Sequence, residues 1–246
     1  MKRLFDIVVA GTGLAVFSPL LLIVGALIWL QDFGSPFYRG ERVGQRGRPF
    51  RMLKFRSMVA RADRTGVRST AGDDRRITRV GHVVRRLKLD ELAQLWNVLK
   101  GEMSLVGPRP NVPTEVALYS QAERGLLEVR PGITDFASIV FSDESEILRG
   151  SKDPDRDYNL LIRPWKSRLG LHYVDMRSMQ LDVRLILLTA LAAVTRARAL
   201  RALQQLLLRT GAPPEVVRAA GRSERLRPTL PPGVAEADWE KHLTYV

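Results

Sequence analysis

The stretch RRLKLDELAQLWNVLKGEMSLVGPRP, residues 85–110, is where charge and turn-forming residues are most concentrated in this 246-residue chain. Its apolar residues recur at helical spacing, at Leu87, Leu92, Leu95, Trp96 and Leu99. This spacing predicts a helix that begins near Leu89 and ends at Gly101, because glycine often follows the last residue of a helix. The adjacent carboxylates Asp90 and Glu91 then lie in the first turn of that helix.

The position of Asp90 and Glu91 indicates two different roles. The first turn of a helix presents unpaired N–H groups and the positive end of the helix dipole, which favours an ionised carboxylate by ~0.3–1 kcal/mol. Successive helical residues point about 100° apart, so the two acids cannot share one partner in the same way. One could act as a nucleophile while the other holds a hard divalent cation, with arginines gripping phosphate oxygens. An ordinary helix start is the alternative, and the commoner one for such a pair taken alone.

The motif L-D-E-L-x-Q-L-x-N-V-L-x-G-x-M-S-L-V-G-P-R-P resembles the signature of the bacterial sugar transferases. These are monotopic polyprenyl-phosphate phosphoglycosyl transferases, which begin glycan assembly on a lipid carrier. The resemblance extends over most of the chain, to KRLFD (residues 2–6), KFRSM (54–58), DRRIT (74–78) and PGIT (131–134). It implies a helix-rich α+β fold: a small catalytic domain with an N-terminal re-entrant membrane helix hairpin and amphipathic surface helices.

Residue usage limits the classes of function. Lys and Arg number 39 against 26 Asp and Glu, and the resulting net charge of +13 predicts attraction to phosphate ligands, an anionic membrane leaflet or nucleic acid. The absence of cysteine excludes disulfides, thiolate nucleophiles and cysteine-built zinc sites, and the 3 histidines lack metal-ligand spacing. Aromatic residues make up only 7% of the chain and are not interleaved with the basic residues, which disfavours a base-stacking surface.

Residues 7–30, IVVAGTGLAVFSPLLLIVGALIWL, form an uncharged run long enough to cross a ~30 Å hydrocarbon core as a helix. The run is longer than a typical signal-peptide core and no A-x-A site follows, so we expect an uncleaved membrane element. Ser18 and Pro19 predict a kink in its middle, and cations on both flanks favour placing both ends on the cytoplasmic side. These features and the family resemblance predict a re-entrant hairpin broken at Ser18-Pro19. A single-pass helix with a tolerated proline is the alternative.

Cations at both ends of the central motif (residues 85–110), and on a segment before it, are candidates for phosphate binding. FRMLKF (residues 50–55) alternates apolar and polar residues, which predicts a half-buried strand that brings Lys54 and Arg56 to a common region. Arg109 stands between two prolines, whose fixed φ holds it on stiff backbone suited to bidentate phosphate recognition. The family resemblance implies phosphate contacts for Lys54, Arg85 and Arg109. Solvated surface cations and a plain proline-rich turn are the alternatives.

The chain departs from the family pattern at several positions. Lys88 and Ala93 replace a serine and a proline, at a cost near 1 kcal/mol for a lost helix cap, and neither change removes a reacting group. DFASIVFSDESEI follows PGIT where the common form has glycine and a W-A-Q-V-like run, so substrate choice could differ. The acid that often precedes the family's Y-Y-V sequence is missing, and Asp143 or Asp175 would have to replace it.

The C-terminal part divides into a helical region and a tail. Residues 179–209 are rich in leucine and alanine on one side and arginine on the other, which predicts amphipathic helices on the membrane surface. Docking against the protein's own core is an equal alternative. From Gly211 onward proline and charge predict an extended tail with at most short helices. The expected domains are 1–36 (re-entrant membrane helix), 37–186 (catalytic domain) and 187–246 (amphipathic C-terminal helix and proline-rich tail).

The resemblance implies a reaction at the cytoplasmic face of the bacterial inner (plasma) membrane. A phospho-sugar would pass from a UDP-sugar, bound with Mg²⁺, to undecaprenyl (polyprenyl) phosphate, with release of UMP, as the first membrane step of exopolysaccharide, O-antigen or glycoconjugate assembly. Asp90 would form an aspartyl phospho-sugar intermediate, Glu91 would help bind the metal, and Lys54, Arg85 and Arg109 would offset phosphate charge.

Two other classes of function stay open beside the transferase that the resemblance implies. One is a catalytically silent, membrane-anchored scaffold for glycan-assembly enzymes, and the other is a membrane-anchored nucleic-acid-binding protein. We expect no nucleic-acid partner, and a homodimer is left open. The sequence names neither the sugar nor the polymer.

Overall fold

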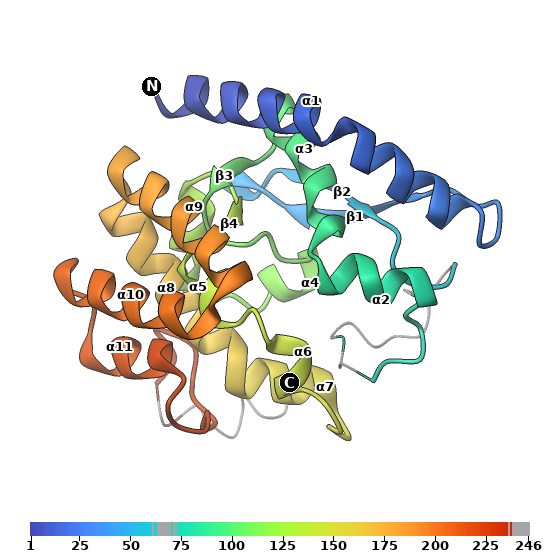
Figure 1. Ribbon diagram of the computed structural model, residues 1–246. Coiled ribbons are helices and arrows are strands. Elements are labelled where there is room, and N and C mark those ends of the chain that lie inside the picture. Colours follow the sequence, from blue (N-terminus) through green and yellow to red (C-terminus); the bar gives the residue numbers. More distant parts are fainter. Residues whose placement is uncertain (61, 63–69, 71–72, 236, 238–246) are drawn as a thin grey trace.

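A computed structural model describes residues 1–60, 62, 70, 73–235 and 237 of the chain. A long N-terminal helix, α1 (Lys2–Trp29), lies along one side of a helix-rich body (Figure 1). The strands of the described residues pair in two small sheets: the antiparallel hairpin of β1 (Phe37–Val43) and β2 (Pro49–Phe55), and the parallel pair of β3 (Ser104–Val106) and β4 (Gly132–Thr134). The predicted helix-rich α+β class is confirmed.

The helical segments are short through the middle of the chain and long toward its C-terminal end. The short segments are η1 (Gln45–Gly47), α2 (Arg79–Arg86), η3 (Leu89–Gln94), α3 (Leu95–Lys100), α4 (Pro113–Val116), η4 (Glu123–Glu128), α5 (Phe136–Val140), α6 (Glu144–Ile147), α7 (Pro154–Asp157) and η5 (Tyr158–Ile162). The C-terminal helices are α8 (Arg163–Met176), α9 (Met179–Val194), α10 (Arg196–Arg209) and α11 (Pro214–Gly221).

Helix α1 continues through Ser18 and Pro19 without folding back on itself. Pro19 has no N–H to donate to the carbonyl oxygen of Ala15, and the Ser18 hydroxyl donates to that oxygen instead, at 2.8 Å. Figure 1 shows the helix bent near its middle but not reversed. The predicted break at Ser18-Pro19 is a bend in a continuous helix, because one proline removes a single backbone bond and a neighbouring hydroxyl compensates for it. The re-entrant hairpin is not confirmed and stays a prediction.

The first residues of α1 are bound to the body by polar contacts. Lys2 Nζ lies 2.5 Å from a carboxylate oxygen of Asp182 in α9, and Arg3 donates to carbonyl oxygens in the last turn of α3. Asp6 is buried and accepts the hydroxyl of Ser104 at 2.9 Å. The rest of α1 is different: only 11% of its most apolar 18-residue window is buried, and the helix is long and apolar enough to cross a membrane. Val24 and Ile28, near the other end of α1, are buried in a second apolar cluster with Phe55 and Val84. Helix α1 is therefore attached to the body at both ends, and its remaining apolar side chains face outward.

The core lies between the β3–β4 pair and helices α5, α8, α9 and α10. Its fully buried members include Phe136, Leu169, Leu185, Leu203 and Leu207. Each buried leucine or phenylalanine contributes roughly 1.5–3 kcal/mol relative to an exposed one, so these contacts hold the C-terminal helices on the body.

Helices α9 and α10 occupy the region predicted to be amphipathic. The apolar side of α10 packs on the core, which is the alternative stated for this region, whereas α9 leaves Leu187 and Val194 exposed at 64% and 84%. A membrane-surface role for the two helices stays a prediction. The domain boundary expected at residue 186 lies inside α9, which is continuous from Met179 to Val194.

Candidate active site

The central motif forms the helix expected from the sequence, with a tighter start. Residue Lys88 is left-handed (φ 55°) and turns the chain from α2 into η3, a 3₁₀ segment that leads directly into α3. Gly101 ends α3 in the left-handed region (φ 84°), a conformation that glycine adopts at no steric cost. The predicted helix from Leu89 to Gly101 is confirmed, and Asp90 and Glu91 lie in its first turn.

Three segments of the chain meet at Glu91. Its Oε1 lies 2.5 Å from Nη2 of Arg109, in the loop after β3, and 3.5 Å from Nζ of Lys54, on β2. These three side chains are between 20% and 32% exposed, so their charges interact across a partly dehydrated space. Sequence reasoning named all three residues, and the tertiary structure brings them together.

The charges of this cluster act on each other's pKa values. Burial alone would raise the pKa of Glu91, but the charges of Arg109 and Lys54, together with the Arg109 hydrogen bond, hold it well below its usual range. Burial lowers the pKa of Lys54, and the positive charge of Arg109 lowers it further. Glu91 is therefore an ionised carboxylate that holds two cations side by side.

Asp90 lies in a different environment from its neighbour. The residue is 8% exposed, and its Oδ1 is buried with no hydrogen-bond partner among the described residues. Burial raises the pKa of Asp90 and the charge of Glu91 adds to this, while Lys54 and Arg85 act in the opposite direction. We expected the helix start to favour the ionised form of Asp90, but desolvation outweighs this effect. Burial costs the ionised carboxylate more free energy than its attraction to the helix dipole contributes. A buried, partnerless carboxylate beside cations is typical of reactive sites.

The other predicted cations differ in position. Arg85, on α2, is half-buried, and its charge lowers the pKa of Asp90 and of Asp74. Arg56 does not share a region with Lys54 as predicted: its Nη2 lies 2.5 Å from Asp32, just beyond α1. The reason is that Arg56 follows the end of β2, where the chain runs beside the C-terminal end of α1. Ser18 and Pro19 lie in α1, outside the charge cluster.

Sequence reasoning missed a second charged pair near the cluster. Glu144 of α6 forms an ion pair with Lys166 of α8, and Lys166 lies 5.1 Å from the ring centroid of Tyr158. Burial would raise the pKa of Glu144, but Lys166, and then Arg109 and Lys88, lower it. The signal for this pair was present, since Glu144 belongs to the DFASIVFSDESEI segment that departs from the family pattern.

The auxiliary acids suggested from the sequence lie elsewhere. Asp143 forms ion pairs with Arg196 and Arg222 at 2.9 and 3.3 Å, and Asp175 is an exposed residue near the end of α8. Neither carboxylate belongs to the ion pairs of Glu91. Glu144 is the acid outside the central motif whose charge acts on Arg109.

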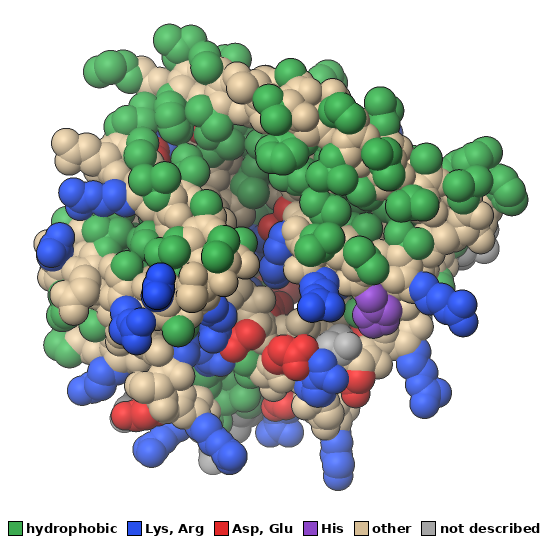
Figure 2. All heavy atoms as spheres, viewed as in Figure 1, with side chains coloured by type: hydrophobic (Ala, Val, Ile, Leu, Met, Phe, Trp, Pro, Cys, Tyr) green, Lys and Arg blue, Asp and Glu red, His purple; other side chains and the backbone are tan. Residues whose placement is uncertain are grey.

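The surface is divided into an apolar side and a charged side. Figure 2 shows apolar side chains over α1 and the adjoining part of this face, and charged side chains over the opposite end. A hollow near the centre of the face, between α9 and α10 on one side and α2 on the other, exposes both acidic and basic side chains (Figures 1 and 2). Charged groups are thus accessible from a face that is also partly apolar.

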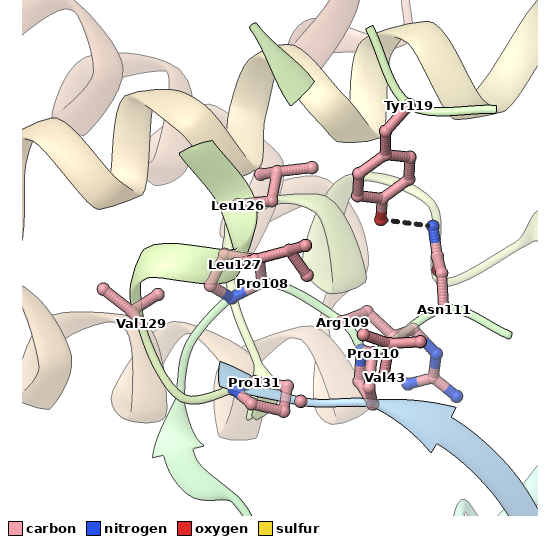
Figure 3. A pocket seen from close by; sticks show the side chains of 11 residues that line it. Val43, Pro108, Arg109, Pro110, Asn111, Tyr119, Leu126, Leu127, Val129 and Pro131 are labelled. Atoms are coloured by element: carbon pink, nitrogen blue, oxygen red, sulfur yellow. Dashed lines mark hydrogen bonds between the residues drawn. The ribbon is translucent and has the colours of Figure 1, made fainter. Parts of the chain in front are cut away.

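A small pocket lies beside the Gly-Pro-Arg-Pro loop, with mostly apolar lining. Asn111 Nδ2 donates to Tyr119 Oη at 3.0 Å across it, and the guanidinium of Arg109 extends away from Leu126 and Val129 (Figure 3). The residues that line the pocket therefore pack around the backbone that carries Arg109. The guanidinium of Arg109 lies outside the pocket, against Glu91.

Comparison with known proteins covers the residues of this cluster. Residues 1–196 match the model of the family described as Bacterial sugar transferase. The exopolysaccharide production protein ExoY of Sinorhizobium fredii is 44% identical over 153 residues, 56% of this chain and 68% of that protein. The uncharacterized sugar transferase EpsL of Bacillus subtilis is 37% identical over 190 residues, 77% of this chain and 85% of that protein.

A further relative has a name that states its reaction. The UDP-glucose:undecaprenyl-phosphate glucose-1-phosphate transferase of Caulobacter vibrioides is 38% identical over 171 residues, 67% of this chain and 63% of that protein. The family match begins with α1 and includes the whole carboxylate and cation cluster. The chain therefore belongs to the bacterial sugar transferase family of enzymes.

Proposed function

We propose that this enzyme transfers a phospho-sugar from a UDP-sugar to undecaprenyl (polyprenyl) phosphate and releases UMP. The observation that carries the proposal is the buried carboxylate of Asp90, whose Oδ1 has no hydrogen-bond partner among the described residues, beside a second carboxylate that holds two cations. The names of the Caulobacter and Sinorhizobium relatives support a nucleotide-sugar donor, an undecaprenyl-phosphate acceptor and a place in exopolysaccharide production.

The reaction proceeds in two displacements at the β-phosphorus of the donor. A carboxylate oxygen of Asp90 attacks that phosphorus, and the bond to the oxygen bridging to the α-phosphate breaks, so UMP leaves with the electron pair. The product is an aspartyl phospho-sugar. A phosphate oxygen of the lipid then attacks the same phosphorus and displaces Asp90, which regenerates the carboxylate and yields the lipid diphosphate-sugar.

The cations make this approach of anions feasible. A carboxylate and a diphosphate repel each other, and the repulsion falls when fixed positive charges lie beside both of them. Arg109 and Lys54 are held by Glu91, and Arg85 lies close enough to act on Asp90, so we assign these three to phosphate binding. Within the described part of the chain, Oδ1 of Asp90 accepts no hydrogen bond that would have to break before the carboxylate attacks.

The number of carboxylates in this cluster is consistent with a Mg²⁺ ion that is shared between the protein and the substrate phosphates. Mg²⁺ is usually held by one or two carboxylates together with substrate phosphates, and the described residues contain no group of three or more acids and histidines that could hold a metal alone. Both ion pairs of Glu91 use Oε1, so we assign the metal to Glu91 together with the phosphates of the donor. When bound, the ion would neutralise phosphate charge.

UMP release tests the proposal. Wild type, Asp90→Asn and the exposed-acid control Asp175→Asn are incubated with a panel of UDP-sugars, Mg²⁺ and undecaprenyl phosphate. We expect lipid-dependent release by wild type and Asp175→Asn and none by Asp90→Asn. Retained activity in Asp90→Asn would refute the covalent mechanism. If folded wild type releases no UMP with any donor, the transferase assignment is wrong. A radiolabelled phospho-sugar that stays on wild type without lipid, but not on Asp90→Asn, is expected for the intermediate.

We also propose that α1 anchors the enzyme in the cytoplasmic leaflet of the bacterial plasma membrane. Its outward side chains are apolar and exposed, and such side chains are more stable in contact with lipid than with water. The chain has no cysteine, so single cysteines at the exposed positions Leu4 and Phe33 report the side of each end of α1. Labelling of both from the cytoplasm supports the re-entrant arrangement, and labelling from opposite sides would establish a single pass.

A further inference from the structure

Residues 142–147 lie between the central motif and the C-terminal helices. Lys88, two residues before Asp90, donates from Nζ to the carbonyl oxygen of Ser142 at 3.4 Å. Glu144 forms its ion pair with Lys166, and the charges of Arg109 and Lys88 lower the pKa of Glu144. Glu144 of this segment and Lys166 of α8 therefore form a hydrogen-bond acceptor and donor pair next to the central motif.

Two arginines from the C-terminal helices hold the other side of this segment. Asp143 Oδ1 lies 2.9 Å from Arg196, and Asp143 Oδ2 lies 3.3 Å from Arg222, just beyond α11. The Arg222 guanidinium also lies 5.5 Å from the ring centroid of Phe141, and its side chain is only 13% exposed. Arg222 lies beyond residue 196, where the family match ends.

Arg222 is the C-cap residue of α11, so the end of that helix fixes the backbone from which its side chain reaches Asp143. Arg222 is left-handed (φ 53°), a conformation that costs a non-glycine residue energy unless surrounding contacts hold it. Exposed ion pairs contribute little, but this pair is mostly buried and is shared with a second arginine on the same carboxylate. The position of Asp143 is therefore determined from two helices outside the catalytic cluster.

We propose that Arg222 is a positioning residue for the donor site, acting through Asp143 to hold Glu144 and Lys166 beside the Arg109 cluster. The proposal rests on the proposed transferase function. The part of the donor that this pair meets is the sugar, because hydroxyl groups accept from a lysine and donate to a carboxylate, and the adjoining cations take the diphosphate. Donor affinity should therefore depend on Arg222, while lipid affinity and the chemical step should not.

The test separates positioning from a merely structural role. Full-length Arg222→Leu, Arg222→Lys, Asp143→Asn, the double variant Arg222→Leu/Asp143→Asn and the exposed control Arg225→Leu are compared in UMP release, with melting temperatures measured alongside. We expect the donor KM to rise about five- to tenfold in Arg222→Leu, with kcat and the lipid KM near wild type. Arg222→Lys should recover part of the donor affinity, Arg225→Leu should match wild type, and the double variant should equal Asp143→Asn alone.

The results that would overturn the positioning role of Arg222 differ from those that would overturn the transferase assignment. If wild type releases UMP and Arg222→Leu keeps the wild-type donor KM, the positioning role is overturned and the proposed function stands. The same holds if the effects of Arg222→Leu and Asp143→Asn on the donor KM multiply in the double variant. If wild type releases no UMP, the proposed function fails, and calorimetric binding of UDP-glucose and UDP-N-acetylgalactosamine then decides the positioning role. Weaker binding by Arg222→Leu than by Arg225→Leu supports it, and equal binding overturns it.

Discussion

Asp90→Asn should stabilise the folded enzyme even as it removes activity. Asp90 is 8% exposed and its Oδ1 lacks a hydrogen-bond partner among the described residues, so the folded state holds a desolvated charge. Burial raises the pKa of this carboxyl despite the attraction of Lys54, which means that the folded state disfavours the ionised form. A neutral amide of the same size removes the part of that cost that comes from the charge.

The magnitude follows from the environment of Asp90. A buried polar group without a partner costs about 1–3 kcal/mol and a charged one costs more, so the amide removes only the difference, and the loss of attraction to nearby cations offsets part of that gain. We therefore expect a gain of about 1 kcal/mol in the free energy of unfolding at neutral pH, or about 2–4 °C in melting temperature for a chain of this size. Because the pKa is raised in the folded state, the cost exists above that pKa and disappears as the carboxyl is protonated in acid.

Thermal unfolding in lipid nanodiscs at neutral and acidic pH measures this difference, with Asp175→Asn as the exposed-acid control. The advantage of Asp90→Asn should be largest at neutral pH and should shrink in acid. A lower melting temperature than wild type at neutral pH would refute the reasoning, because it would mean that attraction to the cations exceeds the cost of burial. A difference that does not change with pH would refute titration of Asp90 as its origin.

Three further substitutions test the packing and charge of the site. Glu91→Gln leaves two partly buried cations unpaired and should lower the free energy of unfolding by about 2–3 kcal/mol. Because the pKa of Glu91 is lowered in the folded state, this deficit should be full at neutral pH and shrink as pH falls below the carboxyl's ordinary range, as urea titrations at each pH would reveal. Leu203→Ala, at a fully buried position, should cost about 2–5 kcal/mol, whereas Leu208→Ala, at 56% exposure, should change stability by less than about 0.5 kcal/mol; equal effects would contradict the described core. Gly107→Ala places a Cβ 2.4 Å from the backbone oxygen of Arg130 and should cost about 1–3 kcal/mol, with a shifted Arg109 and a raised donor KM; wild-type stability and KM would contradict that close approach.

Local sequence patterns were sufficient to predict the helix and the strand that carry the residues of the site. The spacing of leucines and the glycine at position 101 predict the helix of the central motif, and alternation in FRMLKF predicts β2, because both periods are properties of neighbouring residues. The prolines around Arg109 indicate a stiffly held cation for the same reason. Resemblance of these segments to one family also identified the class of enzyme.

Long-range contacts decided the remainder, because desolvation and ion pairing depend on residues that are distant in sequence. Tertiary packing buries Asp90 and so reverses the direction that the helix dipole predicts for its pKa. It sends Arg56 to Asp32 rather than toward Lys54, and it brings Arg222 of the C-terminal region to Asp143. The sequence by itself therefore determined which residues could form the site, and the tertiary structure decided which of them share a charge environment, since electrostatic energy depends on distance and burial and not on chain order.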